Sequence, residues 1–222
     1  METIPPSNFP ATRAAGVAVD CMNYKMGTPN RLFQRQQVTS ARKEIIAGVG
    51  NKYHLAFSIK DSINEQPEIP CTVEVLYYSD KNNTPDVKYN LKTTPENYTA
   101  AKDQDFYSRM MNNKKPLIAE DIPDKFGAVT PEMEPVWNLA IAAAGLAKWK
   151  NATEETLFAM TIIKKVEQLI TSNALELNYD LLIHDMVSQE VIPWRIEVKW
   201  DPSGGLKVKN HKRLPKQNAD HK

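Results

Sequence analysis

The side chains most often used to bind metal ions are scattered along this chain of 222 residues. Its four histidines stand at positions 54, 184, 211 and 221, and its two cysteines are Cys21 and Cys71. No CxxC or HExxH spacing occurs, and no histidine lies three or four residues from a second ligand on an expected helix. Cys21 falls on an apolar helical face, where a packed thiol is more usual than a nucleophile. We therefore expect no metal site, no cofactor and no cysteine-based catalysis.

Motifs for nucleophilic or phosphate chemistry are also missing from the sequence. Residues 48–50 (Gly-Val-Gly) lack the third glycine and the following helical pattern of a dinucleotide-binding turn, and no GxSxG or P-loop sequence occurs. The acidic pairs at 120–121 and 154–155 fit solvated loop ends better than a general acid with its partner. The chain is not expected to be an enzyme.

The most basic segment, residues 207–216, could hold a polyanion such as heparin. It has no acidic residue, and its five cations are Lys207, Lys209, Lys212, Arg213 and Lys216. The alternative is a solvated tail that follows the last strand. No aromatic side chains are interleaved with these cations, so single-stranded nucleic acid is a poor fit.

A polar turn between two strongly alternating strands is the better candidate for a binding site. Residues 181–194 read Leu-Leu-Ile-His-Asp-Met-Val-Ser-Gln-Glu-Val-Ile-Pro-Trp. The apolar alternation on both sides predicts that Ser188, Gln189 and Glu190 cap an exposed hairpin. Loops held by a rigid sheet are where binding residues gather, although an ordinary solvated turn would have the same pattern.

The elements that would position this turn begin with a helix over residues 10–26. Its buried face consists mostly of Ala and Val, and it ends at residues 27–29, Gly-Thr-Pro. Small side chains let a helix lie close to a sheet. The period then changes to that of strands, which are predicted at 32–39, 55–59, 71–77 and 86–93.

The second half of the chain repeats that order. A helix is predicted from Pro131, capped by Thr130, to about Lys150. Residues 156–170 satisfy both a helical and a strand spacing, and we assign a strand because the first half places one directly after its helix. Further strands are predicted at 175–183, 192–200 and 206–209.

This repeat predicts an α+β protein with two similar domains, residues 1–97 and 118–222. Each domain is expected to pack one helix against a four-stranded antiparallel sheet. The linker at 98–117 contains a helical spacing over residues 103–115, which Pro116 ends.

Composition limits the function classes further. Lys and Arg total 28 against 27 Asp and Glu, a net charge of +1, so neither nucleic acid nor a membrane surface is expected as a partner. The start of the chain lacks a signal-peptide pattern, no apolar run is long enough to span a bilayer, and two cysteines suit a reducing compartment. We therefore expect a cytoplasmic protein, in which the sequons at Asn82, Asn97 and Asn151 are chance matches.

The chain resembles the latexin family along essentially its whole length. The shared stretches occur in order and at matching spacing. They are Ile4-Pro-Pro, Asn23-Tyr24, Gly27-Thr28-Pro29, Cys71-Thr-Val-Glu-Val-Leu-Tyr77, Phe106-Tyr107, Lys115-Pro-Leu117, Ile122-Pro-Asp124, Phe126-Gly127, Pro131-Glu-Met133, Asn151-Ala-Thr-Glu154, Ser188-Gln-Glu190, Ile192-Pro-Trp194 and Arg213-Leu-Pro-Lys216. The resemblance implies two cystatin-like domains, each a helix wrapped by a curved sheet, and supports the strand at 156–170.

The resemblance also implies a function, the inhibition of zinc-dependent carboxypeptidases of the A class by a monomer. The hairpin of the second domain, together with the face between the domains, would plug the funnel that leads to the protease active site. Gln189 would reach deepest, because an amide both donates and accepts hydrogen bonds. The residues around it would be Asp185, Met186, Val187, Ser188, Glu190 and Val191. The family is further associated with inflammation and heparin binding, which the basic segment could serve.

Two other functions stay open. A cystatin-type inhibitor of papain-like cysteine proteases would use a Gln-x-Val-x-Gly hairpin, but residues 34–41 read Gln-Arg-Gln-Gln-Val-Thr-Ser-Ala and lack the glycine. Pro193-Trp194 is similar to the cystatin Pro-Trp pair but begins a long alternating strand. The other alternative is a polyanion-binding module without inhibitory activity.

Overall fold

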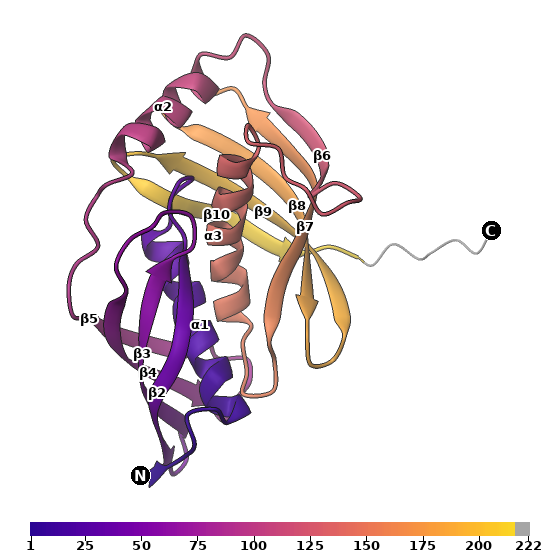
Figure 1. Ribbon diagram of the computed structural model, residues 1–222. Helices are drawn as coiled ribbons and strands as arrows, with labels where there is room; N and C mark the ends of the chain where they lie inside the picture. The colour runs from indigo at the N-terminus through magenta and orange to yellow at the C-terminus, as the bar shows by residue number, and fades with distance from the viewer. Residues whose placement is uncertain (216–222) are drawn as a thin grey trace.

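The computed structural model describes residues 1–215 and contains two five-stranded antiparallel sheets, each packed against one long helix (Figure 1). The first unit has strand order β1-β2-β3-β4-β5 and surrounds helix α1. Its elements are β1 (Glu2–Thr3), α1 (Phe9–Met26), β2 (Phe33–Ile46), β3 (Gly50–Asp61), β4 (Ile69–Tyr78) and β5 (Asp86–Leu91).

The second unit repeats this arrangement with strand order β10-β9-β8-β7-β6 around helix α3. Its elements are β6 (Ile118–Ile122), α3 (Glu134–Lys150), β7 (Phe158–Leu169), β8 (Leu175–Asp185), β9 (Glu190–Asp201) and β10 (Gly205–Arg213). Helix α2 (Ala100–Met111) lies between the two units in the sequence. The α+β fold class with two similar helix–sheet units is confirmed, as is the strand expected at 156–170.

Each sheet has one strand more than the four that were expected. The additional strands are β1 and β6, which precede the helices and pair along the edges of β2 and β7. Two and five residues are too few to show an alternating pattern, so sequence spacing could not reveal them. Helix α3 also begins at Glu134 rather than Pro131, because residues 131–133 form a turn in which Thr130 O accepts from the N–H of Met133 and of Glu134.

The alanine-rich faces of α1 and α3 let these helices pack closely against each other as well as against the sheets. The two helices lie in contact between the two sheets (Figure 1). A Cβ atom added at Gly145 would lie 2.5 Å from Asp20 O, and one added at Gly27 would lie 3.1 Å from Ala142 Cβ. The backbones of the two helices therefore touch, which only very small side chains permit. An ion pair between Asp20 and Lys148, both nearly buried, crosses the same contact.

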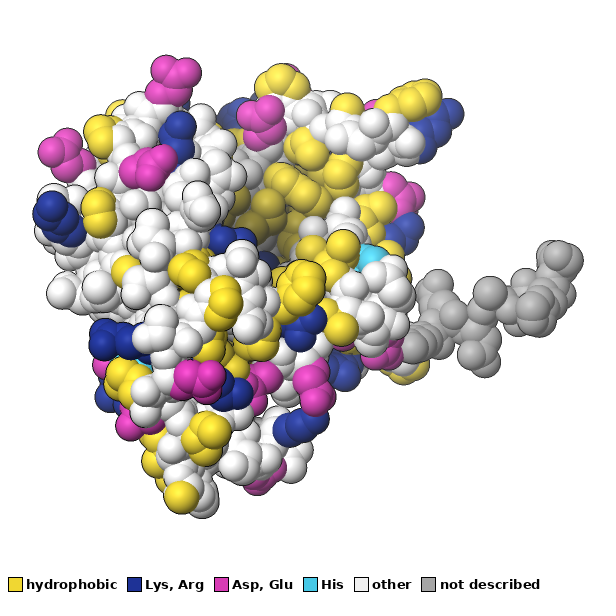
Figure 2. All heavy atoms as spheres, turned by 60° about the horizontal axis from the view of Figure 1, so that its bottom comes forward, with side chains coloured by type: hydrophobic (Ala, Val, Ile, Leu, Met, Phe, Trp, Pro, Cys, Tyr) yellow, Lys and Arg dark blue, Asp and Glu magenta, His cyan; other side chains and the backbone are white. Residues whose placement is uncertain are grey.

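The strands β2 and β7 each carry two register irregularities, β2 between Arg35 and Ser40 and β7 between Met160 and Lys165. Bulges bend a strand and increase its twist, which lets each sheet curve around its helix. Figure 2 shows charged side chains of both signs over one face of the molecule and hydrophobic side chains gathered in a hollow. In the part of the chain that the structure describes, no helix is long and apolar enough to cross a membrane.

Candidate functional site

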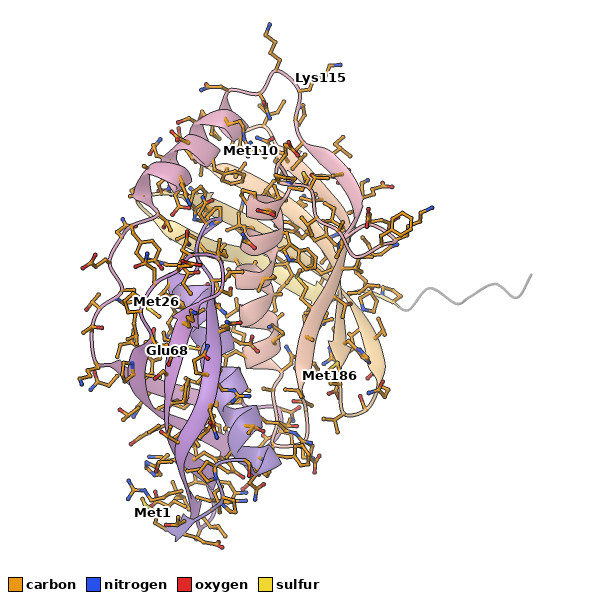
Figure 3. All side chains as sticks on the ribbon, viewed as in Figure 1. Met1, Met26, Glu68, Met110, Lys115 and Met186 are labelled. Atoms are coloured by element: carbon orange, nitrogen blue, oxygen red, sulfur yellow. The ribbon has the colours of Figure 1, made fainter. Side chains whose placement is uncertain are left out.

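The predicted turn lies at the end of a hairpin that is regular along its whole length. Strands β8 and β9 pair without interruption from Leu175 opposite Trp200 to Asp185 opposite Glu190. Alternate side chains along both strands are buried against α3, so the hairpin is fixed on its inner face. Residues 186–189 form the turn, closed by a 2.8 Å hydrogen bond from Gln189 N to Asp185 O. Figure 3 shows Met186 at this tip, at the opposite end of the second unit from Met110 of α2.

Asp185 braces the turn from inside. Its side chain is only 6% exposed, and its carboxylate accepts hydrogen bonds from Leu157 N at 3.0 Å, Val187 N at 3.2 Å and Ser188 Oγ at 2.6 Å. Burial alone would raise the pKa of the Asp185 carboxyl, but these N–H and O–H donors outweigh it and lower that pKa below its ordinary value. Asp185 and Ser188 therefore hold the turn in place, and their polar groups are directed at each other.

Gln189 adopts a backbone conformation that few non-glycine residues adopt, with φ at +62°. This region costs roughly 1–2 kcal/mol for a residue with a side chain, and such strain gathers at functional sites. In the unbound protein the Gln189 side chain is exposed and folds back, so that Nε2 donates to Met186 O at 2.7 Å. Hydrogen bonds within the turn thus hold the tip in one shape.

Exposed apolar side chains surround Gln189. Met186, Val187 and Val191 are 44–46% exposed, although all three are large hydrophobic residues. Leu157, which is 41% exposed, joins them because its carbonyl accepts a 2.8 Å hydrogen bond from Met186 N. Sequence reasoning missed Leu157, since only the pairing of Phe158 with Asp185 brings the start of β7 beside the turn.

The seven residues expected at this site lie in the turn and at the ends of the two strands beside it, and their side chains differ in direction. Met186, Val187, Gln189 and Val191 present side chains to solvent, whereas Asp185 and Ser188 bond inward. Glu190 is half-buried as the first residue of β9. We name the exposed set, Leu157 with Met186, Val187, Gln189 and Val191, the tip surface.

Some of the basic residues on β10 are engaged by neighbouring groups, and others lie opposite cations of β9. Lys209 Nζ lies 2.9 Å from Glu176 Oε2, and the Arg213 guanidinium lies over the Trp194 ring at 5.4 Å. Lys207 and Lys212 are exposed on this edge strand, opposite Lys199 and Arg195 of β9. Arg195 in turn forms two 2.7 Å hydrogen bonds to Asp180. Lys216, the fifth cation of the expected polyanion site, lies outside the described residues.

The other candidate sites in the described chain offer no reactive group, as the cavity carboxylates, the possible metal ligands and the cysteines show. A cavity of about 750 Å³ lies between α1, α2 and the β9–β10 turn. Its carboxylates already accept hydrogen bonds, Asp103 from Asn30 and Thr99 and Asp201 from Ser203. Among residues 1–215, no group of three His, Cys, Asp or Glu side chains could hold a metal ion. Both cysteines are buried, and burial raises the pKa of the Cys71 thiol to about 11, so it is not a thiolate nucleophile near neutral pH.

Known proteins resemble this chain over nearly its full length. Mouse latexin and human latexin are each 44% identical over 216 residues, which cover 96% of this chain and 97% of the relative. Human retinoic acid receptor responder protein 1 is 28% identical, over 90% of this chain and 70% of that protein. Among solved structures, mouse fetuin-B aligns over 98% of this chain and 72% of its own, with 11% identity and a TM-score of 0.31.

The family described as latexin matches residues 4–218. This range includes both helix–sheet units and the β8–β9 turn. Together with 44% identity across nearly the whole of two latexins, the match is decisive. The chain belongs to the latexin family.

Proposed function

We propose that this protein inhibits zinc-dependent carboxypeptidases of the A class, as the latexin family is known to do, and that the β8–β9 turn enters the mouth of the protease. The observation that carries the proposal is the tip surface, where four large apolar side chains stay at least 41% exposed around Gln189. Monomeric proteins seldom leave such residues clustered and exposed unless a partner covers them.

Inhibition by this route requires no chemistry from the inhibitor. A carboxypeptidase removes residues from a free chain end, and the turn at 186–189 offers none, because both of its ends continue into paired strands. The turn can therefore fill the funnel without being cleaved. The hydrogen bonds to Asp185 fix its backbone beforehand, so little conformational entropy is lost on docking.

In this proposal Gln189 makes the deepest contact. It stands at the turn's end, and its side-chain amide can exchange the bond to Met186 O for bonds to the protease. The apolar residues beside it would lie against the funnel wall, where removing their area from water contributes most of the affinity.

The test is inhibition of a purified A-type carboxypeptidase by the full chain, with stoichiometry measured by titration. We expect competitive, one-to-one inhibition and no inhibition of papain assayed in parallel. Papain inhibition without carboxypeptidase inhibition would favour the cystatin alternative and overturn the proposal.

A single substitution tests the contribution of the turn to inhibition separately from that of the rest of the molecule. Gln189→Gly removes the side chain and keeps the backbone conformation, since glycine adopts positive φ without strain. We expect the inhibition constant to rise about tenfold or more, a typical effect of a central interface residue. Gln66→Gly, in the loop after β3 of the first unit, controls for the loss of a glutamine side chain elsewhere and should leave inhibition unchanged. Equal constants for the wild type and Gln189→Gly would move the contact away from this turn.

A further inference from the structure

The loop between β6 and α3 presents an aromatic side chain that the fold does not use. Phe126 is 83% exposed, and Lys125 Nζ lies over its ring, 5.0 Å from the centroid. Within the described chain, Ile170 is the other large hydrophobic residue that is more than 80% exposed. A single exposed hydrophobic residue is common on a protein surface, so what distinguishes Phe126 is the position and the fixed shape of the loop that carries it.

Hydrogen bonds within the loop hold Phe126 in place. Asp124 Oδ1 accepts from Phe126 N and from Ala128 N, each at 2.9 Å. Asp124 N donates to Ala128 O, and Gly127 N donates to Asp124 O, again at 2.9 Å each. Gly127 has φ at +82°, a conformation that suits glycine. The aromatic ring is therefore presented by a fixed backbone rather than by a loose loop.

Strand directions send this loop toward the same end of the sheet as the tip surface. β6 runs antiparallel to β7, and its last residue, Ile122, pairs with Ile163. β7 begins at Phe158, opposite Asp185 at the base of the turn. The two pairing positions are five residues apart along β7, about 16 Å. In Figure 1 the β6–α3 loop and the β8–β9 turn lie on the same side of the second unit.

The size of a stable interface argues that one partner covers both places. Such an interface takes about 20–30 residues from each protein, in a patch of about 800 Å². The tip surface has only five residues, so it cannot form the interface alone. A patch of that area is about 30 Å across, wide enough to include the tip surface and a loop that starts about 16 Å away.

We propose that Phe126 is a second binding residue for the same carboxypeptidase, packing on an apolar part of the funnel rim while the turn at 186–189 enters the funnel. This inference rests on the proposed function. Lys125 and Phe126 would offer a contact of aromatic and cationic character, and hydrogen bonds to Asp124 already fix the loop that carries them.

The test compares Phe126→Ala with Ile170→Ala in the full chain. Ile170 is 85% exposed but follows β7 at the end of the strand far from the turn, so it controls for loss of an exposed apolar side chain. We expect Phe126→Ala to raise the inhibition constant about 10- to 30-fold, mainly through faster dissociation, and Ile170→Ala to leave it unchanged. Thermal melts should match the wild type for both variants, because neither side chain is packed.

The possible outcomes distinguish a failure of this inference from a failure of the proposed function. If the wild type inhibits and Phe126→Ala equals Ile170→Ala, the inference is wrong and the proposed function stands. If the wild type does not inhibit, the proposed function fails and this inference fails with it. A change in the self-association of the unbound protein on Phe126→Ala, without a change in inhibition, would show that a second copy covers the ring and would overturn the inference.

Discussion

The loop after β3 and the turn after β8 occupy equivalent positions in the two units and start from the same device. Each follows a strand that ends in a buried aspartate, Asp61 at 4% and Asp185 at 6% exposure. Each aspartate accepts bonds from the backbone just beyond it, Asp61 from Ile63 N and Asp185 from Val187 N. In both units a buried carboxylate thus fixes the path of the chain as it leaves the sheet.

The surroundings of these two aspartates differ. The loop after β3, residues 62–68, lies against the segment that leads to α2. Tyr98 OH donates to Asp61, Asn64 Nδ2 donates to Asn30 O at 2.8 Å, and Lys102 Nζ donates to Asn64 Oδ1 at 3.4 Å. The β8–β9 turn has only four residues and leaves its apolar side chains in solvent. In the first unit the loop beyond the aspartate packs against the segment that leads to α2. In the second unit the turn beyond the aspartate leaves the tip surface exposed.

The sharpest way to break this contrast is to remove each aspartate in turn. Asp185→Ala leaves Leu157 N, Val187 N and Ser188 Oγ without their acceptor, which should cost about 2–4 kcal/mol of folding stability. Because the turn also loses its fixed shape, we expect the inhibition constant to rise about 100-fold. Chemical denaturation and a carboxypeptidase inhibition assay measure the two effects.

Asp61→Ala is the matched variant. It should lower stability by a similar amount and leave inhibition unchanged at temperatures where the protein stays folded. If it weakened inhibition as much as Asp185→Ala, the two loops would not have separate roles, and the first unit would have to contribute to the binding surface.

A smaller effect is expected where the two units meet. Glu154, just before β7, accepts from Tyr53 OH, from Asn51 Nδ2 at 2.7 Å and from Lys43 Nζ at 3.3 Å. Burial would raise the pKa of Glu154, but these donors of the first unit lower it below its ordinary value. Glu154→Gln should cost about 2 kcal/mol at pH 7, where the charge-assisted bonds are fully formed.

The sign of the pH dependence follows from that lowered pKa. The stability from Glu154 is fully present above the unfolded-state pKa of about 4.5 and is lost as pH falls through the lower pKa of the folded protein. The stability difference between the wild type and Glu154→Gln, followed by denaturation from pH 7 to pH 3, should therefore shrink below pH 4.5. Glu155→Gln changes the neighbouring, three-quarters exposed carboxylate and should show neither effect. A constant difference across this range would mean that the Glu154 charge does not join the units.

The smallest expected effect concerns the hydrogen bond from Tyr98 OH to the Asp61 carboxylate. Tyr98→Phe removes one donor to that carboxylate and leaves the backbone donors in place, so it should lower stability by about 1 kcal/mol. Inhibition should not change. A variant with intact stability and weakened inhibition would show that the segment before α2 belongs to the binding surface.

Regular strands were the most predictable part of the molecule, because alternation along β4, β8 and β9 is strong enough to define both faces. The short strands β1 and β6 carry no such signal, and β7 was recognisable only through the repeat, since its bulges disturb the alternation. The helix that the sequence predicts at 103–115 is observed at Ala100–Met111, so both of its ends lie a few residues earlier than predicted.

The sequence predicts the hairpin, but it does not predict which of its side chains bond inward and which face solvent. Asp185 and Val187 are two residues apart in the turn, and nothing in their sequence shows that one bonds inward while the other faces solvent. That depends on where the N–H groups of Leu157 and Val187 point once β7 and β8 have paired. For the same reason the sequence did not mark Leu157 as a neighbour of the turn.

The contact between α1 and α3 changes what the internal repeat means for evolution. Each half has the elements of a complete small protein, yet a side chain at Gly145 of α3 would collide with the backbone of α1 at Asp20. If the repeat arose by duplication, the copies have since given up their independence, because a larger residue in either helix would now push both halves apart. Selection on such a molecule acts on the pair, and the first unit can be retained as the support that keeps the second unit in its working shape.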